Sequence, residues 1–253
     1  MSVRRRVPAA LLALALPLAA ASDERAAESE PPRRGLGLAI AHAERPYRGA
    51  SARTRWRPFA VYEGRRLRLH GDAASFDIAA GDAFAVAAVA SLAQDGYEAS
   101  DAPVLAGMAE RGSPVWAGAS LRWRRGAFEA VLEWTADVSG HSGGRRAALR
   151  VGRAFDLGRW RLAPRASATR FDARAAGYYH GVRAEEAHAG RPAYAPGAAV
   201  SLGVGLHLAR RLGRRDAVFL DLGTERAGAS VRAGPLGGDD VRTHAVVGYL
   251  RMF

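Results

Sequence analysis

The residues that most resemble a reaction centre lie between Asp137 and Gly144. Gly140-His141-Ser142-Gly143-Gly144 carries the spacing G-x-S-x-G, and Asp137 lies just before it. In hydrolases this spacing places a serine nucleophile on a sharp turn between a strand and a helix. Residues 146–155 (RAALRVGRAF) have the character of a second strand, and Gly and Ser are ordinary turn residues. We therefore interpret the motif as a hairpin loop and expect no enzymatic activity, with a hydrolase as the minor alternative.

Two further groups of residues could bind a metal or a cofactor, but neither matches the pattern that such a site requires. His180 and His188 flank Glu185 and Glu186, but this spacing matches no established ligand pattern, so we interpret them as solvated loop residues. Gly35-Leu36-Gly37 lacks the following helix and acidic partner of a dinucleotide site. The chain has no cysteine, which excludes disulfides and thiolate chemistry. We predict neither a metal nor a cofactor.

Around these residues, apolar and polar positions alternate with a period of two. Leu132 and Trp134, for example, alternate with Glu133 and Thr135. Such alternation predicts β-strands with one apolar face, although a soluble sandwich or barrel would show the same pattern. We predict twelve strands: 35–42, 57–62, 65–71, 74–80, 83–93, 114–124, 127–137, 146–155, 159–171, 198–210, 216–226 and 241–253.

The lengths of the connections between these strands favour a membrane barrel. Every second connection is a tight turn, such as Glu63-Gly64 or Arg125-Gly126. The others are mostly long: 43–56, 94–113, 138–145, 172–197 and 227–240, with 72–73 as the exception. Outer-membrane barrels have short periplasmic turns and long outer loops. We therefore predict an all-β, transmembrane, antiparallel up-and-down β-barrel in the outer membrane, with both termini on the periplasmic side.

The N-terminal residues predict export. Arg4, Arg5 and Arg6 precede an apolar stretch, 7–18, and Ala19-Ala20-Ala21 supplies small residues for cleavage. The apolar stretch is shorter than the roughly twenty residues that a membrane-spanning helix needs. We predict a cleaved signal peptide over 1–21, a flexible periplasmic lead-in over 22–34 and the barrel over 35–253.

The C-terminal residues predict the closing strand. Residues 241–253 (VRTHAVVGYLRMF) alternate in character and end on an aromatic residue. Aromatic residues form girdles at both edges of the apolar band of such barrels. We expect Tyr249 and Phe253 to act as an assembly signal for the barrel-assembly machinery.

Charged positions on the polar faces predict a charged lumen. Because an arginine facing the middle of the bilayer costs roughly 2–4 kcal/mol, charges must point inward. This set comprises Arg66, Arg68, Arg122, Arg124, Glu129, Glu133, Asp137, Arg150 and Asp221. The strands 114–124 and 127–137 carry opposite signs, which predicts ion pairs between them. We favour a filled lumen over a narrow polar pore, because open porins have about sixteen to eighteen strands.

The chain is basic, with 37 Lys and Arg against 25 Asp and Glu and a net charge of +12. A basic balance raises nucleic acid as a partner, but the arginines are spread along the sequence and export removes the protein from nucleic acid. We predict no nucleic-acid binding, and expect outer-membrane lipid and lipopolysaccharide as the surroundings of a basic rim.

One loop and several shorter blocks resemble a known family. The segment 177–198 (GYYHGVRAEEAHAGRPAYAPGA) is similar to the signature loop of the MipA/OmpV family of outer-membrane proteins. Weaker similarity occurs at 46–49, 101–108, 137–143 and 234–236, in family order, so that the resemblance covers nearly all of 35–253. Its signature residues here are Tyr178, Tyr179, Gly181, Val182, Glu186, Tyr194, Pro196 and Gly197. The chain departs from the family at His180, where a third tyrosine is usual.

The resemblance implies an interaction role and no catalytic residues. The family's named member is described as a scaffold that links a lytic transglycosylase to a peptidoglycan synthase, and other members are treated as porin-like or as surface antigens. We therefore expect an envelope scaffold, with peptidoglycan synthase and lytic transglycosylase as candidate partners. The alternative is a small channel for polar or anionic solutes, and an outer-membrane hydrolase is the minor one.

Overall fold

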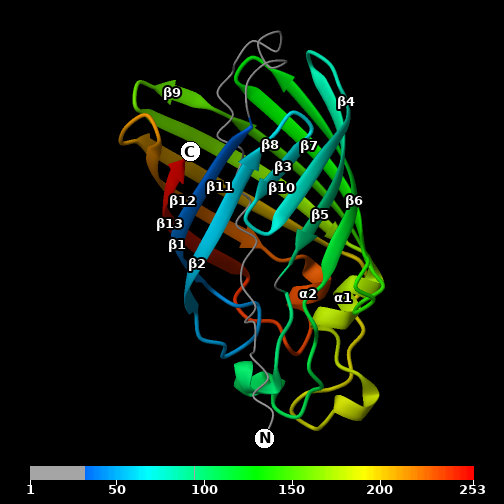
Figure 1. Ribbon diagram of the computed structural model, residues 1–253. Coiled ribbons are helices and arrows are strands. Elements are labelled where there is room, and N and C mark those ends of the chain that lie inside the picture. Colours follow the sequence, from blue (N-terminus) through cyan, green and yellow to red (C-terminus); the bar gives the residue numbers. More distant parts are fainter. Residues whose placement is uncertain (1–31, 94) are drawn as a thin grey trace, which may run out of the picture.

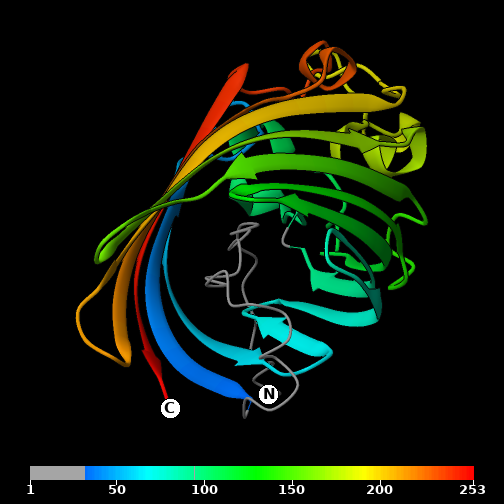
Figure 2. The ribbon, with the colours of Figure 1, turned by 90° about the horizontal axis from the view of Figure 1, so that it is seen from above.

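Consecutive strands pair side by side until the last one meets the first. The computed structural model describes residues 32–93 and 95–253. Within them, a closed antiparallel barrel forms because β13 pairs with β1 as well as with β12 (Figures 1 and 2). The twelve barrel strands are β1 (Arg33–Ala43), β2 (Arg53–Glu63), β3 (Leu67–His70), β4 (Ala73–Ala80), β5 (Phe84–Leu92), β6 (Val115–Arg125), β7 (Phe128–Asp137), β8 (Arg145–Arg153), β10 (Trp160–Phe171), β11 (Ala199–Arg211), β12 (Asp216–Arg226) and β13 (Val241–Met252).

All twelve predicted strands are present, with small changes at their ends. A further short strand, β9 (Phe155–Leu157), continues β8 past residue 154 and pairs with the beginning of β10. Strand β2 begins earlier than predicted, at Arg53 instead of residue 57, and the added residues Arg53 and Arg55 point into the lumen. Strand β3 is shorter than predicted, because 64–66 form the turn before it.

Alternation along each strand separates a lipid-facing side from a lumen-facing side. On β1, Leu36 and Leu38 are exposed on the outside, whereas Ala39 and Ala41 are buried inside. From Gly35 to Ala43 the inward side of β1 consists only of Gly and Ala, and a Cβ on Gly37 would overlap the ring of Phe59. The outward leucines, valines and aromatics form the apolar band that a transmembrane barrel presents to lipid.

The predicted asymmetry of the connections is confirmed. Figure 1 shows the turns at one end of the barrel and the loops with helices α1 (Ala173–His180) and α2 (Ala229–Arg232) at the other. The turns 64–66, 81–83, 126–127, 158–159 and 212–215 share the first end with the beginning of β1 and the end of β13. We call this the short-turn end, and the opposite one the long-loop end.

Some sequence predictions concern residues that the structure does not describe. The signal peptide over 1–21 and the lead-in as far as residue 31 lie outside the described residues, while Arg33 and Arg34, predicted as lead-in, belong to β1. Of the helices in the described ranges, none has both the length and the apolar character needed to cross a membrane.

The closing strand generates the first testable prediction. The backbone N–H of Phe253 donates to the carbonyl oxygen of Arg34 over 2.8 Å, and the Tyr249 hydroxyl contacts Asp216. Deleting Phe253 removes an aromatic and a hydrogen bond at the seam where β13 meets β1. We expect a smaller fraction of the protein in the outer membrane to migrate on gels as a folded, heat-modifiable barrel. The control is Phe253→Tyr, which keeps an aromatic residue at this position. Normal assembly of the deletion variant would contradict the assembly-signal role.

Candidate functional site

The lumen is apolar on one side near the short-turn end and charged elsewhere. Towards the short-turn end, small or apolar residues face inward from β1, β12 and β13, and the rings of Phe59 and Phe219 meet edge to face with centroids 5.8 Å apart. Cβ atoms on Gly37 and Gly248 would overlap these two rings, so the glycines make room for them. This side therefore fills part of the lumen with hydrocarbon.

Ion pairs cover the side of the lumen formed by β3 to β7. Arg124 Nε donates to Glu129 over 3.1 Å, which places that predicted pair between β6 and β7. Arg122 instead contacts Asp77 of β4 at 3.4 Å, and Arg68 contacts the same carboxylate. Strand β5 between them presents small residues there, so the longer side chains meet across it.

Glu133 also pairs away from β6. Its two carboxylate oxygens accept from Arg146 at 2.8 Å and from Arg150 at 3.2 Å, both on β8. Of the charges predicted to pair between these two strands, Arg124 and Glu129 do so, whereas Arg122 pairs with β4 and Glu133 with β8. The reason is that sequence alternation gives the sign of the charges on each strand but not how far each side chain reaches.

A second cluster centres on the buried carboxylate of Asp221. Arg165 donates to both of its oxygens over 2.8 and 2.6 Å, and His207 and His244 lie 3.3 and 3.4 Å from it. Gly223 lies against the ring of His244 and leaves no space for a Cβ. The bidentate geometry is the strongest arrangement that a guanidinium makes with a carboxylate, so this cluster ties β10, β11, β12 and β13 together.

Two of the predicted lumen charges lie at the ends of the barrel. Arg66 is exposed in the turn before β3. Asp137 ends β7 and accepts from the backbone N–H groups of Ser139 and Ser142 over 2.9 and 2.6 Å. It also accepts from both serine hydroxyls.

The serine–histidine motif forms a turn around Asp137. The Ser142 hydroxyl donates a hydrogen bond to Asp137. The Nδ1 atom of His141 lies 2.8 Å from the hydroxyl of Ser139, and no contact between His141 and Ser142 is described. A serine nucleophile needs a base within hydrogen-bond reach. The arrangement has the geometry of a side chain that holds a hairpin loop, as the sequence predicted.

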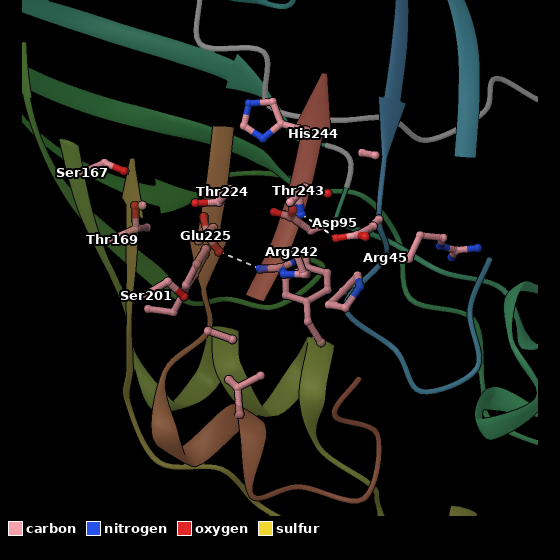
Figure 3. A pocket seen from close by; sticks show the side chains of 18 of the residues that line it. Arg45, Asp95, Ser167, Thr169, Ser201, Thr224, Glu225, Arg242, Thr243 and His244 are labelled. Carbon is pink, nitrogen blue, oxygen red and sulfur yellow. Dashed lines mark hydrogen bonds and ion pairs between the residues drawn. The ribbon is translucent and has the colours of Figure 1, made fainter. Parts of the chain in front are cut away.

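The lumen contains two adjoining cavities. The outer cavity, of about 290 Å³, lies towards the long-loop end, and Figure 3 shows its polar residues. The inner cavity, of about 300 Å³, lies towards the short-turn end beside Phe59 and Phe219. Both are lined by Arg146, Arg150 and Arg165, which form the boundary between them.

Loops cover the outer cavity. We call the described parts of 44–52, 93–114, 172–198 and 227–240 the cap. Its apolar centre buries Tyr47, Tyr97, Leu105, Met108 and Leu236 together with Val182 of the signature loop. Four different connections supply these residues, so the loops form one packed layer at the long-loop end, beside α1 and α2 in Figure 1.

A buried ion pair holds the signature loop in the cap. Arg111, only 2% exposed, donates from Nη2 to both oxygens of Glu186 over 2.8 Å and from Nε to the carbonyl of Tyr178 over 2.9 Å. Its guanidinium also lies over the rings of Tyr97 and Tyr178. Glu186 further accepts from two backbone N–H groups, those of Ala109 and Arg183. Each oxygen of this carboxylate is therefore satisfied.

The remaining signature residues fix the shape of the same loop. Val182 and Tyr194 form an isolated antiparallel bridge, and the Tyr194 hydroxyl donates to Ser230 over 2.7 Å. The Tyr179 hydroxyl donates to the carbonyl of Gly112 over 3.3 Å. Gly181 has no room for a Cβ, because the carbonyls of Gly177 and Tyr194 lie too close. Pro196 is buried, and Gly197 is exposed.

Sequence reasoning missed the residues that receive the signature loop. Arg191 donates to the carbonyls of Val104 and Ala106 over 2.7 and 2.8 Å, and Arg45 donates to Asp101 over 2.6 Å. Their only signal was their position inside or beside the blocks that resemble the family. No local pattern distinguishes a buried loop arginine from a solvated one.

The candidate metal ligands face different partners. His180, at the end of α1, lies beside the Tyr47 ring with centroids 6.0 Å apart, and burial lowers its pKa to about 3. His188 accepts from the N–H of Gly190, Glu185 is exposed, and Glu186 belongs to the pair with Arg111. These side chains do not converge, and the described residues contain no other group suited to a metal ion.

The carboxylates of the cap are held in their charged form. Burial alone would raise the pKa of Glu186, but hydrogen bonds from Arg111 and from backbone N–H groups lower it below its usual value. Burial is likewise outweighed at Asp101, where Arg45 and the Glu98 N–H bring the pKa to about 2. A lowered pKa stabilises the cap at neutral pH, and this stabilisation is lost as the pH falls below the usual carboxylate range.

The Arg111–Glu186 pair generates the second prediction. Glu186→Gln leaves a buried guanidinium without a counter-charge, which typically costs about 3–5 kcal/mol. We expect faster hydrogen exchange of cap amides while barrel amides stay protected. Glu185→Gln, which removes an exposed charge next to it, is the matched control. If the cap amides exchange equally fast in Glu186→Gln and Glu185→Gln, the ion pair does not hold the cap together.

One protein family and several solved structures are similar to this chain. A model of the MltA-interacting protein MipA family matches residues 36–253, and no curated protein matches the chain. An outer-membrane channel of Pseudomonas putida F1 is 10% identical, with 89% of this chain and 97% of that chain covered and a TM-score of 0.42. The NanC porin is 11% identical, with 84% and 98% covered and a TM-score of 0.42. The toluene transporter TbuX of Ralstonia pickettii is 12% identical, with 89% and 90% covered and a TM-score of 0.41.

The family match extends from the beginning of β1 to the last residue, and includes the strands, the cap and the Asp137 loop. The solved structures are too distant for their substrates to be transferred to this chain. The protein is an outer-membrane β-barrel that belongs to the MltA-interacting protein MipA family.

Proposed function

We propose that the protein is an envelope scaffold that binds an acidic periplasmic partner through the short-turn end of its barrel. The observation that supports this proposal is a ring of arginines at that end, which we call the arginine rim. It comprises thirteen exposed residues: Arg33, Arg34, Arg65, Arg66, Arg124, Arg125, Arg153, Arg159, Arg210, Arg211, Arg214, Arg215 and Arg251.

Few acidic residues neutralise the arginine rim. Five lie at the same end: Glu63, Asp82, Glu129, Asp156 and Asp216. Several rim arginines are held against aromatic rings at the edge of the apolar band, as Arg153 is over Phe128 and Arg210 over Trp160, at 4.8 and 5.2 Å. Ordered, uncompensated positive charge attracts an acidic surface and steers its approach. The arginines that are spread along the sequence thus gather in space.

The nature of the partner is suggested by the family. Its description names an interaction with MltA, and the resemblance described above implies a lytic transglycosylase and a peptidoglycan synthase. Both would reach the barrel from the periplasm, where we place the short-turn end and both termini. In the membrane, the barrel would contact the lipid phosphates of the inner leaflet and the lipopolysaccharide of the outer leaflet.

The second candidate function is a narrow pore for polar or anionic solutes. The two adjoining cavities with arginines at their boundary favour it. The cap and the paired lumen charges favour the scaffold, because a packed layer of loops closes the outer end. A barrel of twelve strands is narrower than an open porin.

The orientation generates the third prediction. An epitope tag inserted after Gly190, in the exposed part of the signature loop, should be labelled by antibody on intact cells. A tag after Gly126, in the turn between β6 and β7, should be labelled only after the outer membrane is permeabilised. The opposite labelling would place the arginine rim at the cell surface and end the proposal of a periplasmic scaffold.

The fourth prediction tests the arginine rim itself. Reversing Arg65, Arg66, Arg214 and Arg215 to Glu should reduce the amount of lytic transglycosylase that co-purifies after crosslinking, and added salt should reduce it in the wild type. Reversing the exposed cap arginines Arg48 and Arg174 is the matched control and should leave the yield unchanged.

Planar-bilayer recordings on the same variants separate the two functions. The scaffold predicts little conductance in the wild type and an unchanged trace in the rim variant. Equal crosslinking of all variants, together with a stable anion-selective conductance, would favour the pore.

A further inference from the structure

We propose that the outer cavity is a binding site for a small oxyanion, a phosphate or a carboxylate, with Arg55 as its principal ligand. The site lies inside the barrel under the cap, at the opposite end from the arginine rim. The proposal is therefore independent of the scaffold function.

Arg55 is the middle member of a row of three inward arginines on β2. Its neighbours on the same face have carboxylate partners: Arg53 donates to Asp101 over 2.8 Å, and Arg57 donates to Asp72. Arg55 lines the outer cavity, and its Nη1 atom is inaccessible to solvent and has no hydrogen-bond partner among the described residues. Of the three guanidinium groups, that of Arg55 is therefore the one for which no hydrogen bond or ion pair with a carboxylate is described.

This arrangement is unfavourable for an empty protein. A guanidinium withdrawn from water without an acceptor loses its hydration, and two like charges on the same strand face add repulsion. An oxyanion in the cavity would supply the acceptor and offset the repulsion. The planar guanidinium matches the geometry of a phosphate or carboxylate, to which it donates two parallel hydrogen bonds.

The other walls of the cavity supply further donors. The hydroxyls of Ser167, Thr169 and Ser201 line it from β10 and β11, and Figure 3 shows them on the wall opposite Arg45 and Asp95. Seven arginines line the cavity, and six of them form ion pairs with carboxylates, which leaves Arg55 as the one with no described ion pair. Hydroxyl groups around a guanidinium are a donor set suited to an anion.

The carboxylates in the cavity do not take the place of the ligand. Glu225 accepts from Arg242 over 2.6 Å, and Glu44 accepts from the backbone N–H of Thr243 over 2.6 Å. Burial raises the pKa of Asp95 above its usual value. None of the three has a described contact with Arg55. The cavity, of about 290 Å³, has the size of a site for a small molecule.

Titration calorimetry on the purified full barrel in detergent tests the site. Inorganic phosphate and acetate are the two probes, in separate titrations, and their relative affinity shows which oxyanion the cavity prefers. Arg55→Gln should weaken binding of the preferred probe at least about tenfold, since a hydrogen bond to a charged group is lost. Arg161→Gln is the matched control, because Arg161 points inward from β10 near the short-turn end, beside Asp156 at 3.5 Å.

A second measurement separates a binding role from a structural one. Removing an uncompensated charge should raise the unfolding temperature of Arg55→Gln above that of the wild type in anion-free buffer. Added phosphate should stabilise the wild type by mass action and leave Arg55→Gln unchanged. Arg55→Lys keeps the charge without the planar fork, so it should retain weaker binding and a smaller stabilisation by phosphate.

Three results would overturn the proposal. The first is a wild-type barrel that binds neither phosphate nor acetate. The second is an Arg55→Gln variant that binds as the wild type does. The third is an Arg55→Gln variant that is less stable than the wild type or fails to assemble while Arg55→Lys shows no response to phosphate, since Arg55 would then be structural.

Discussion

The structure depends on one constraint, the cost of placing a charge or an unpaired backbone group against hydrocarbon. Closing the sheet between β13 and β1 gives each of the twelve barrel strands a paired neighbour on both sides, as lipid requires of a spanning sheet. With the outside reserved for residues such as Leu36 and Leu132, charges remain only on the inside and at the two ends. In a chain with 37 basic residues, this constraint decides where nearly everything else lies.

The arginines accordingly occupy three places and do something different in each. In the lumen they pair with the carboxylates of Asp77, Glu133 and Asp221, and at Asp77 and Asp221 they join strands that are not consecutive in sequence. In the cap, Arg111 and Arg191 bind carboxylate and carbonyl oxygens and shape the loops. At the short-turn end thirteen of them are exposed, whereas fewer exposed arginines, such as Arg48 and Arg174, lie at the long-loop end. This difference is why we propose that an acidic partner binds at the short-turn end.

The cap connects the family signature to the barrel. Glu186 and the tyrosines of the signature loop are engaged with residues from other loops, chiefly Arg111, Gly112 and Ser230. These contacts lie inside the protein, so the signature residues determine how the loops close the long-loop end. They do not describe a surface for a partner, so the surface that we propose for interaction is the arginine rim, and the covered cavity is a separate feature.

The sequence by itself determined the twelve strands, their inward and outward faces and the asymmetry of the loops, because these follow from local alternation and turn residues. It also predicted ion pairs between the strands 114–124 and 127–137, where Arg124 and Glu129 lie directly opposite. Only the tertiary structure decided that Arg122 reaches Asp77, that Glu186 meets Arg111, that Nη1 of Arg55 has no partner among the described residues and that thirteen of the described arginines gather at one end. The reason is that closure of the barrel and folding of the loops bring together side chains far apart in sequence, and their reach across small residues is not written in any local pattern.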